Sequence, residues 1–238
     1  GYLPGVREVL AAAGRLPGVL GTVASLVQVP PELEDAIGAA LGVRLQDLVT
    51  ETWDAAATAI AHLKRTGRGW ATFLPLDSLR PRSALALRPD ADVVGVASQL
   101  VRYDDRLRPA VELLLGRTVV VRDLDAARRM LAGRSGASLF VTLEGETVQA
   151  SGVLSGGARR ERNNLLQQER EWRELPGQLD AADSAVSAAE SAVSAARREV
   201  GDLVQARRAG ERALSEARAQ LQHSQQTASN DEDSLRRA

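Results

Sequence analysis

The last third of the chain carries a regular spacing of apolar residues that few folds allow. Steps of seven reach an apolar residue at all but one position, the exception being arginine: Leu165, Trp172, Leu179, Val186, Val193, Val200, Arg207, Leu214 and Leu221. A second series lies three residues further on and is mostly small or apolar: Gln168, Leu175, Ala182, Ala189, Ala196, Leu203, Gly210 and Ala217. Alternating steps of three and four place a stripe along one side of a helix, and a 3.5-residue repeat predicts a left-handed coiled coil.

The residues between these positions favour the same interpretation. Eight of the nine prolines precede residue 110, and none follows Pro176. A helix over residues 178–229 would be roughly 80 Å long at ~1.5 Å per residue. The alternative, an amphipathic helix lying on its own domain, is disfavoured by that length. We therefore expect a coiled-coil arm over residues 158–238, with a break near residues 175–177 where Leu175-Pro176-Gly177 stands.

An apolar stripe of this kind needs a partner helix. The chain holds no second heptad segment. Two copies of the arm could pair, or the partner could be an N-terminal arm helix of the same protein that is missing from this sequence. We expect the second arrangement.

Residues 1–157 follow a different pattern, in which strand-like and helix-like runs alternate. The predicted strands are 23–29, 44–50, 70–74, 93–96, 118–121, 139–143 and 147–150. The predicted helices are 31–41, 53–65, 109–115 and 124–131. Alternation of this kind predicts an α/β domain. A proline-containing stretch at about 79–91 is interpreted as a linker between one subdomain at about 1–78 and another at about 92–157.

The composition excludes several classes of site. The chain has no cysteine and two histidines far apart, so a zinc site cannot be assembled. The one lysine, Lys64, is not in a phosphate-binding loop. The acidic pairs Asp104-Asp105 and Glu144/Glu146 fall in an expected loop and turn. We predict no catalytic residue, cofactor or metal in this chain, and no apolar run approaches the ~20 residues that cross a bilayer.

Glycines and arginines gather where the last strand meets the arm. Gly152, Gly156 and Gly157 would serve either a flexible linker or a surface that another backbone approaches closely. Arg159, Arg160 and Arg162 lie at the start of the expected helix, where the helix dipole favours an anion. They are either ordinary solvated charges or a local, sequence-independent contact for DNA phosphates. The net charge of −1 adds no general attraction.

Several blocks together resemble the hinge domain of structural maintenance of chromosomes (SMC) proteins of the bacterial type. Similar blocks appear in the family's order over about residues 5–158. They are Gly18-Val19-Leu20-Gly21-Thr22-Val23-Ala24-Ser25-Leu26-Val27, Ala40-Leu41-Gly42-Val43-Arg44-Leu45-Gln46-Asp47-Leu48-Val49, Gly69-Trp70-Ala71-Thr72-Phe73-Leu74-Pro75-Leu76, Val141-Thr142-Leu143-Glu144-Gly145-Glu146 and 151–157. The absence of a Cys-x-x-Cys hook separates the chain from the zinc-hook relatives.

The resemblance implies a fold and a function. It implies an α/β hinge of two pseudo-related subdomains with mixed sheets and flanking helices, which forms a homodimer through sheet edges and glycines. A long coiled-coil helix follows, and ATPase heads lie at the far ends of the arms. It gives dimerisation to Gly152, Gly156 and Gly157, and DNA contact to Arg159, Arg160 and Arg162. Ser151 stands where some relatives have glycine, which weakens that part of the match.

Three functions follow as hypotheses. The first is a non-catalytic dimerisation hinge of a chromosome-organising ATPase, cytoplasmic and associated with the nucleoid, that contacts DNA without sequence preference and no membrane. The second is a coiled-coil scaffold module that binds protein only. The third, a small-molecule α/β enzyme with a coiled-coil appendage, is disfavoured by the lack of a recognisable catalytic motif.

Overall fold

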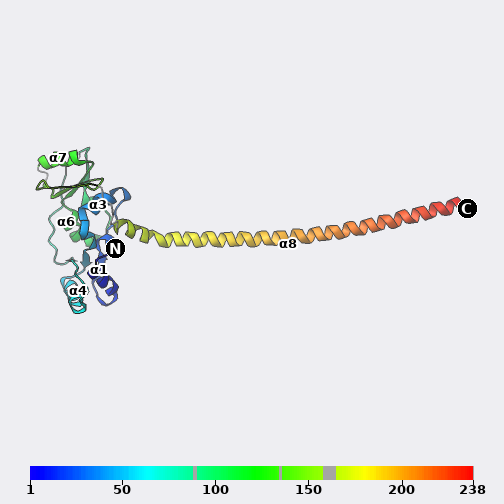
Figure 1. The fold of residues 1–238 in the computed structure, drawn as a ribbon, viewed down its shortest axis with the longest axis horizontal. Helices are drawn as coiled ribbons and strands as arrows, with labels where there is room; N and C mark the ends of the chain where they lie inside the picture. Colours follow the sequence, from blue (N-terminus) through cyan, green and yellow to red (C-terminus); the bar gives the residue numbers. More distant parts are fainter. Residues whose placement is uncertain (88–89, 134–135, 158–164, 238) are drawn as a thin grey trace. The chain divides into compact units, whose positions relative to one another are not determined.

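The computed structural model describes residues 1–87, 90–133, 136–157 and 165–237, with side chains described as far as residue 227 (Figure 1). The chain divides into two compact units, Gly1–Glu174 and Leu175–Ala238. The first unit contains every strand and also the first turns of the last helix. It therefore runs beyond residue 157, and the predicted boundary there stays a prediction.

The first half of the globular unit is built on a three-stranded sheet. Its strands are β1 (Val19–Thr22), β2 (Leu48–Thr50) and β3 (Phe73–Pro75), in the order β1-β2-β3. β1 pairs with β2 antiparallel, and β2 pairs with β3 parallel, so the sheet is mixed. Its helices are α1 (Pro4–Ala11), α2 (Val23–Leu26), α3 (Glu34–Leu41) and α4 (Trp53–Thr66).

The second half is built on a five-stranded sheet with the order β4-β5-β6-β7-β8. Its strands are β4 (Val93–Val96), β5 (Thr118–Val121), β6 (Leu139–Thr142), β7 (Thr147–Gln149) and β8 (Leu154–Ser155). Only the β5–β6 pair is parallel. The helices are α5 (Ala97–Leu100), α6 (Arg108–Leu115) and α7 (Leu124–Ala132). The predicted α/β class with mixed sheets is confirmed.

The two halves repeat one another with a constant offset of 74 residues from β1 to the end of α3. Gly21 and Gly95 correspond, each at a β-bulge with positive φ, 146° and 156°. Corresponding residues also meet, because Gln28 and Arg102 exchange two backbone hydrogen bonds of 2.8 and 2.9 Å. A bridge between equivalent residues places a local two-fold axis between them. The division into separate subdomains stays a prediction, but the internal repeat is present.

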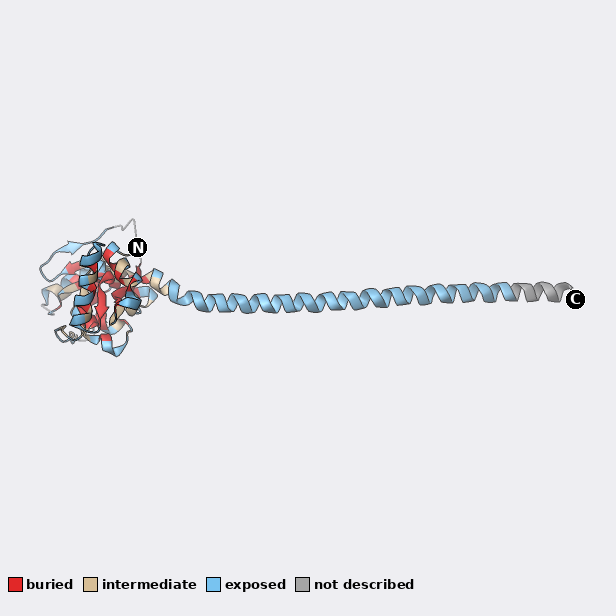
Figure 2. Ribbon diagram, turned by 90° about the horizontal axis from the view of Figure 1, so that it is seen from below, coloured by how far each residue is buried: buried red, intermediate tan, exposed pale blue. Residues whose placement is uncertain are grey.

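The halves share their largest core. Buried residues from both repeats form one cluster, which includes the equivalent pairs Val27 and Val101, Leu33 and Leu107, Ala36 and Ala110, Ile37 and Val111, and Leu41 and Leu115. Two smaller clusters belong to one half each, one under α1 and α4 and one under α7. Figure 2 shows these buried residues concentrated in the globular unit. Because α3 and α6 both contribute to the shared cluster, neither half can lose its helix without exposing the other's core.

The strand predicted over 23–29 is wrong. The strand ends at Thr22, whose side chain accepts a hydrogen bond from the backbone N–H of Ser25 and forms a capping box with it. This cap starts the single-turn helix α2. It does so although Val23 and Val27 are β-branched, a property that favours a strand. The strand predicted over 44–50 is right only from Leu48, because residues 42–46 form a 3₁₀ turn. Helix α1 was not predicted.

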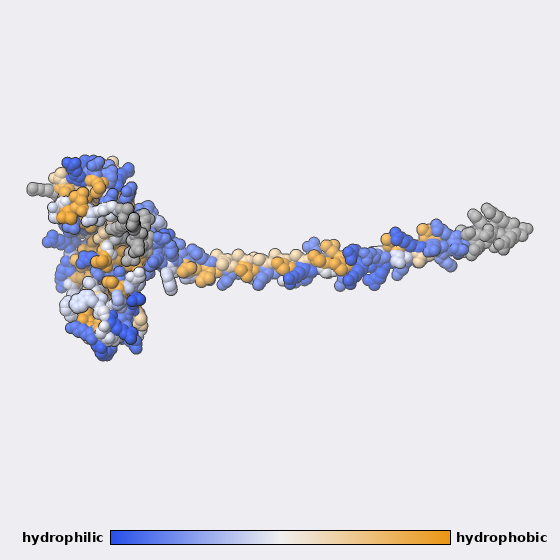
Figure 3. All heavy atoms as spheres, viewed as in Figure 1, coloured by the Kyte–Doolittle hydropathy of each residue, from blue (hydrophilic) through white to orange (hydrophobic). Residues whose placement is uncertain are grey.

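The second unit, Leu175–Ala238, is the remainder of helix α8 (Leu165–Arg237). The predicted break at residues 175–177 is wrong, because α8 continues as α-helix with Pro176 inside it. Seven apolar stripe residues of this unit are more than half exposed: Leu179, Val186, Val193, Val200, Leu203, Leu214 and Leu221. Figure 3 shows apolar residues recurring along this helix. Such a stripe in water requires a partner helix.

The N-terminal cap of α7 gives a local test of the fold. The Asp123 side chain accepts a 2.8 Å hydrogen bond from the N–H of Ala126. Asp123→Ala should lower the free energy of unfolding by about 1 kcal/mol, because one helix-end amide loses its partner. Urea denaturation followed by circular dichroism measures this loss. Arg128→Ala, on the exposed face of α7, is the control and should change stability little; equal effects of the two variants would contradict the cap.

Candidate dimerisation surface and arm junction

β8 is an exposed edge strand with apolar side chains. It pairs only with β7 in the described sheet, through Thr147 with Ser155 and Val148 with Leu154. The side chains of Val153 and Leu154 are 52% and 63% exposed. An edge strand offers unpaired backbone groups to another strand, and soluble proteins normally protect such edges with charge or a covering element. An apolar edge left open is typical of a surface that another chain covers.

The three predicted glycines flank this strand, and each also has a reason within the chain. Gly152 has φ of +88° in the turn between β7 and β8, where its N–H donates to the Gln149 carbonyl at 2.8 Å. A Cβ on Gly156 would lie 2.9 Å from Cγ of Glu146. Gly157 has φ of +119°. The structure brings all three to the open edge of the second sheet, so the predicted residues lie together. Their role in dimerisation stays a prediction.

Val153 and Leu154 were not singled out from the sequence. Two apolar residues between glycines were a signal, but their exposure depends on β8 being the last strand of the sheet. The first sheet has an edge at β3, and Trp70, just before it, is 84% exposed. Each half of the globular unit therefore presents an edge with an apolar side chain in or beside it.

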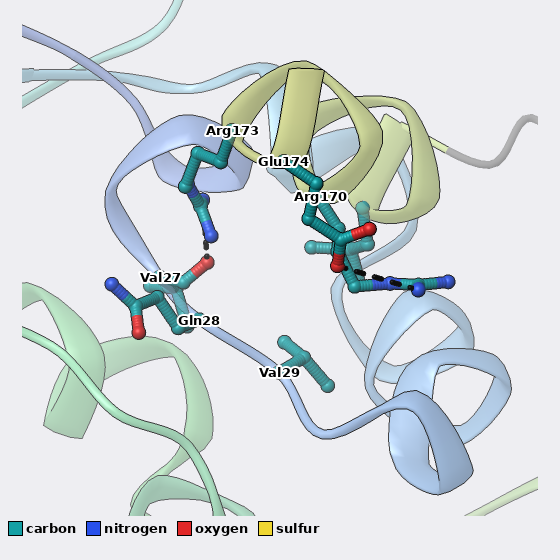
Figure 4. Close-up of a pocket in the computed structure, with 7 residues that line it drawn as sticks. Val27, Gln28, Val29, Arg170, Arg173 and Glu174 are labelled. Atoms are coloured by element: carbon teal, nitrogen blue, oxygen red, sulfur yellow. Dashed lines mark hydrogen bonds and ion pairs between the residues drawn. The ribbon is translucent and has the colours of Figure 1, made fainter. Parts of the chain in front are cut away.

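The predicted DNA contacts Arg159, Arg160 and Arg162 lie outside the described residues. The next arginines along α8 are described and are bound to the first half. Arg170 Nε lies 2.8 Å from Oε1 of Glu34, whose side chain is only 9% exposed. The Arg173 guanidinium donates to the carbonyl of Ser25 at 3.2 Å and to that of Val27 at 3.4 Å, the second of which is drawn in Figure 4.

Apolar contacts hold the same turns of α8. Leu165 and Leu166 are buried in the core that the two halves share. A Cβ added to Gly38 of α3 would lie 3.9 Å from Cδ1 of Leu166, an ordinary van der Waals distance, so Leu166 lies directly beside α3 here. We call residues 165–174 the α8 root. Its contacts explain why the compact unit continues to Glu174.

Tyr2 connects the start of the chain to the α8 root. Its hydroxyl donates to Oε1 of Glu169 and lies 3.1 Å from Oγ1 of Thr22. Burial, followed by the hydrogen bond to Glu169, raises the pKa of Tyr2 to about 12. A raised pKa means that the folded chain holds this proton more tightly than the unfolded chain. The stabilisation is complete below pH 10 and is lost as the pH rises from about 10 to about 12.

This shift can be read directly, because the chain has two tyrosines. Ultraviolet titration of the phenols should show one group ionising near pH 12. Tyr2→Phe should remove that group from the titration. A Tyr2 phenol that titrates near 10, the ordinary value, would contradict the contact with Glu169.

Two carboxyl groups, Glu8 and Asp47, also have shifted pKa values. Nε2 of His62, on α4, lies 2.8 Å from Oε1 of Glu8, on α1. His62 and Arg68 both hold the pKa of the Glu8 carboxyl below its usual value. Burial raises the pKa of Asp47. Among the described residues, no group of three or more His, Asp or Glu could hold a metal, and no helix is long and apolar enough to cross a membrane.

Comparison with known proteins agrees with this architecture. Residues 16–131 match the family model described as the flexible hinge domain of SMC proteins. An asymmetric dimer of the SMC hinge domain of Geobacillus stearothermophilus is 38% identical with a TM-score of 0.72, over 84% of this chain and 83% of that one. The Pyrococcus furiosus SMC hinge domain is 31% identical with a TM-score of 0.56, over 68% of this chain and 84% of that one.

Curated relatives are similar over most of this chain. The chromosome partition protein Smc of Desulfitobacterium hafniense is 38% identical over 188 residues, which is 76% of this chain. The protein of the same name from Bacillus subtilis is 37% identical over 185 residues, which is 75% of this chain. In both cases the match spans only 16% of the relative's length.

Proposed function

The chain belongs to the family of SMC flexible hinge domains, and from this we propose that two copies of it form the dimerisation hinge of a chromosome-organising SMC ATPase. One observation carries the proposal: Leu154 in the open strand β8 and Val153 just before it are exposed to solvent between glycines. Covering this strand removes apolar surface from water and supplies partners for its backbone. Gly152, Gly156 and Gly157 then allow another backbone to come close.

The two open edges support a symmetric dimer with two contacts. In a two-fold dimer, any contact between unlike surfaces occurs twice. If β8 of one copy meets the β3 edge of its partner, then the reverse contact forms as well. Trp70, beside β3, is a large side chain that such a contact would cover. The structural relative from Geobacillus stearothermophilus is an asymmetric dimer, so it supports dimerisation but not the symmetry proposed for this chain.

The arm supports the rest of the proposal. The exposed stripe of α8 is suited to an N-terminal arm helix of the same protein, so that the two helices form one coiled-coil arm. ATPase heads would lie in parts of the protein outside this chain, and the hinge would act without catalysis or cofactor. We place this function in the cytoplasm at the nucleoid.

The scaffold alternative is tested by the arm stripe. Val186→Lys together with Val193→Lys would put charges into a coiled-coil seam. The hinge proposal expects the whole chain to remain a dimer of about 51 kDa, twice 25.4 kDa, in sedimentation equilibrium. A fall to 25.4 kDa would show that the arm drives association and would favour the scaffold.

We also propose a DNA contact at the start of the arm. Arg159, Arg160 and Arg162 would bind phosphates without reading bases, so binding should weaken with salt. Replacing all three with alanine should make the dependence of log K on log salt shallower by roughly 2.7, at about 0.9 for each phosphate contact. Fluorescence anisotropy with a labelled DNA duplex across a salt series measures this slope. Arg197→Ala with Arg198→Ala is the control, and an equal change there would contradict a local site.

A further inference from the structure

The groove that holds the α8 root occurs a second time on the globular unit. In the first half, the α8 root lies against residues 25–29 and α3: Arg173 binds the carbonyls of Ser25 and Val27 (the latter drawn in Figure 4), and Arg170 binds Glu34. The 74-residue offset takes residues 27–29 to residues 101–103, and α3 to α6. The structure has a hollow of about 410 Å³ at that place. We call it the second groove. Its walls include residues of α5 and α6, and none of its lining residues belongs to α8.

Equivalent backbone groups are available in both grooves. In the first, Arg173 binds the carbonyls of Ser25 and Val27. Their equivalents are the carbonyls of Gln99 and Val101, and both residues line the second groove. A helix entering there would find the same pair of acceptors for a basic side chain. Tyr103, in place of Val29, adds apolar surface to the wall.

The charges on the walls differ in a way that selects the occupant. Glu34, which binds Arg170 in the first groove, is replaced by Arg108 in the second. Gln28 is replaced by Arg102, which also lines the groove. The position that receives a cation in the first groove therefore offers a cation in the second. Asp105 and Glu112 also line the second groove, and Glu112 stands where Gly38 lies beside Leu166 in the first. The ligand must therefore bring a carboxylate to Arg108 and a small or basic residue to Glu112.

We propose that the second groove binds an amphipathic helix of a partner protein, which places a carboxylate against Arg108 and, three residues later, a basic side chain against the carbonyls of Gln99 and Val101. This spacing copies Arg170 and Arg173 of the α8 root with the first charge reversed. The proposal does not depend on dimerisation. It rests on the internal repeat and on the groove itself.

Two observations bear on this occupant. The root of a second copy is disfavoured, because its Arg170 would meet Arg108, and like charges oppose binding. Arg108 is at present paired with Asp105 at 2.7 Å, but the two side chains are 59% and 89% exposed. Exposed ion pairs contribute little to stability, so an incoming carboxylate can replace Asp105 at low cost.

A charge-swap experiment with two peptides tests the groove. The probes are fluorescein-labelled peptides of residues 163–177, one with the native sequence and one carrying Arg170→Glu. The Arg170→Glu peptide should bind the whole chain, and Arg108→Glu in the chain should weaken that binding at least tenfold. The native peptide should show the opposite preference, because Arg108→Glu makes the second groove resemble the first. Fluorescence anisotropy at low salt gives both affinities.

The controls separate the groove from general charge effects. Arg122→Glu makes the same charge change outside the second groove and should leave both affinities unchanged. Circular dichroism checks that each variant is folded. If Arg108→Glu does not fold, Arg102→Glu is the alternative substitution in the second groove. Failure of the Arg170→Glu peptide to bind, or binding insensitive to these groove residues, would overturn the proposal. Sedimentation equilibrium of Arg108→Glu should still show a dimer, which keeps this test separate from that of the hinge.

Discussion

Leu154→Glu is expected to turn the dimer into a monomer. Each of the two contacts in a symmetric dimer would then bury an unpaired carboxylate at the β8 edge, and one such charge costs about 3–5 kcal/mol. The dimer dissociation constant should rise at least ~10³-fold. Sedimentation equilibrium of the whole chain should show a fall from about 51 kDa to 25.4 kDa. Since Leu154 is 63% exposed, the fold of each copy should survive the change.

Val43→Glu is the matched control for this variant. Val43 is 79% exposed and lies in a 3₁₀ turn that belongs to neither sheet, so the same substitution there should leave the dimer intact. A Leu154→Glu chain that remains a dimer at micromolar concentration would place the interface elsewhere and remove the main support for the hinge proposal. Loss of the dimer in both variants would point to a general effect of added negative charge.

Ile37→Ala should destabilise both halves of the globular unit together. Ile37 is fully buried in the shared core, and removing a buried isoleucine side chain costs about 2–5 kcal/mol. At about 3 kcal/mol, amide exchange that requires global unfolding should speed up about 100-fold. The effect should reach Val49 in β2 and Val120 in β5 alike, because both strands contribute to this core. Mass-spectrometric or NMR hydrogen exchange measures the two sites separately.

Ile60→Ala gives the comparison. Ile60 lies on the outer side of α4 and is 40% exposed, so its loss should change exchange in either sheet by less than tenfold. Faster exchange in the first half alone after Ile37→Ala would show that the halves unfold independently. Such a result would contradict the single shared core.

Signals carried by neighbouring residues predicted much of this protein. The heptad of α8, the helix α4 ended by Gly67, and the helix α7 capped by Asp123 depend on contacts within one turn or on a repeating pattern. The strands at 93–96 and 118–121 were also predicted from short apolar runs. The family blocks led to the correct family, and they placed three glycines at what proved to be a sheet edge.

Two predictions from local sequence were wrong because neighbouring residues favoured another structure. The run from Val23 to Val29 has the composition of a strand, but the cap between Thr22 and Ser25 starts a helix. Pro176 removes one backbone hydrogen bond, and yet α8 continues through it. Propensity gives only a preference, which capping and the surrounding helix can overcome.

The sequence by itself determined the class of the fold, the long helix and the family, because each depends on periodicity or on residues close together in the chain. Only the tertiary structure decided which surfaces are open. β8 is an edge because it is the last strand in the order of its sheet and pairs only with β7 among the described strands. Glu34 contacts Arg170 although 136 residues separate them. The two repeats are brought together at Gln28 and Arg102 only in the folded chain. Contacts at such separations depend on how the chain packs, and no local pattern of residues records them.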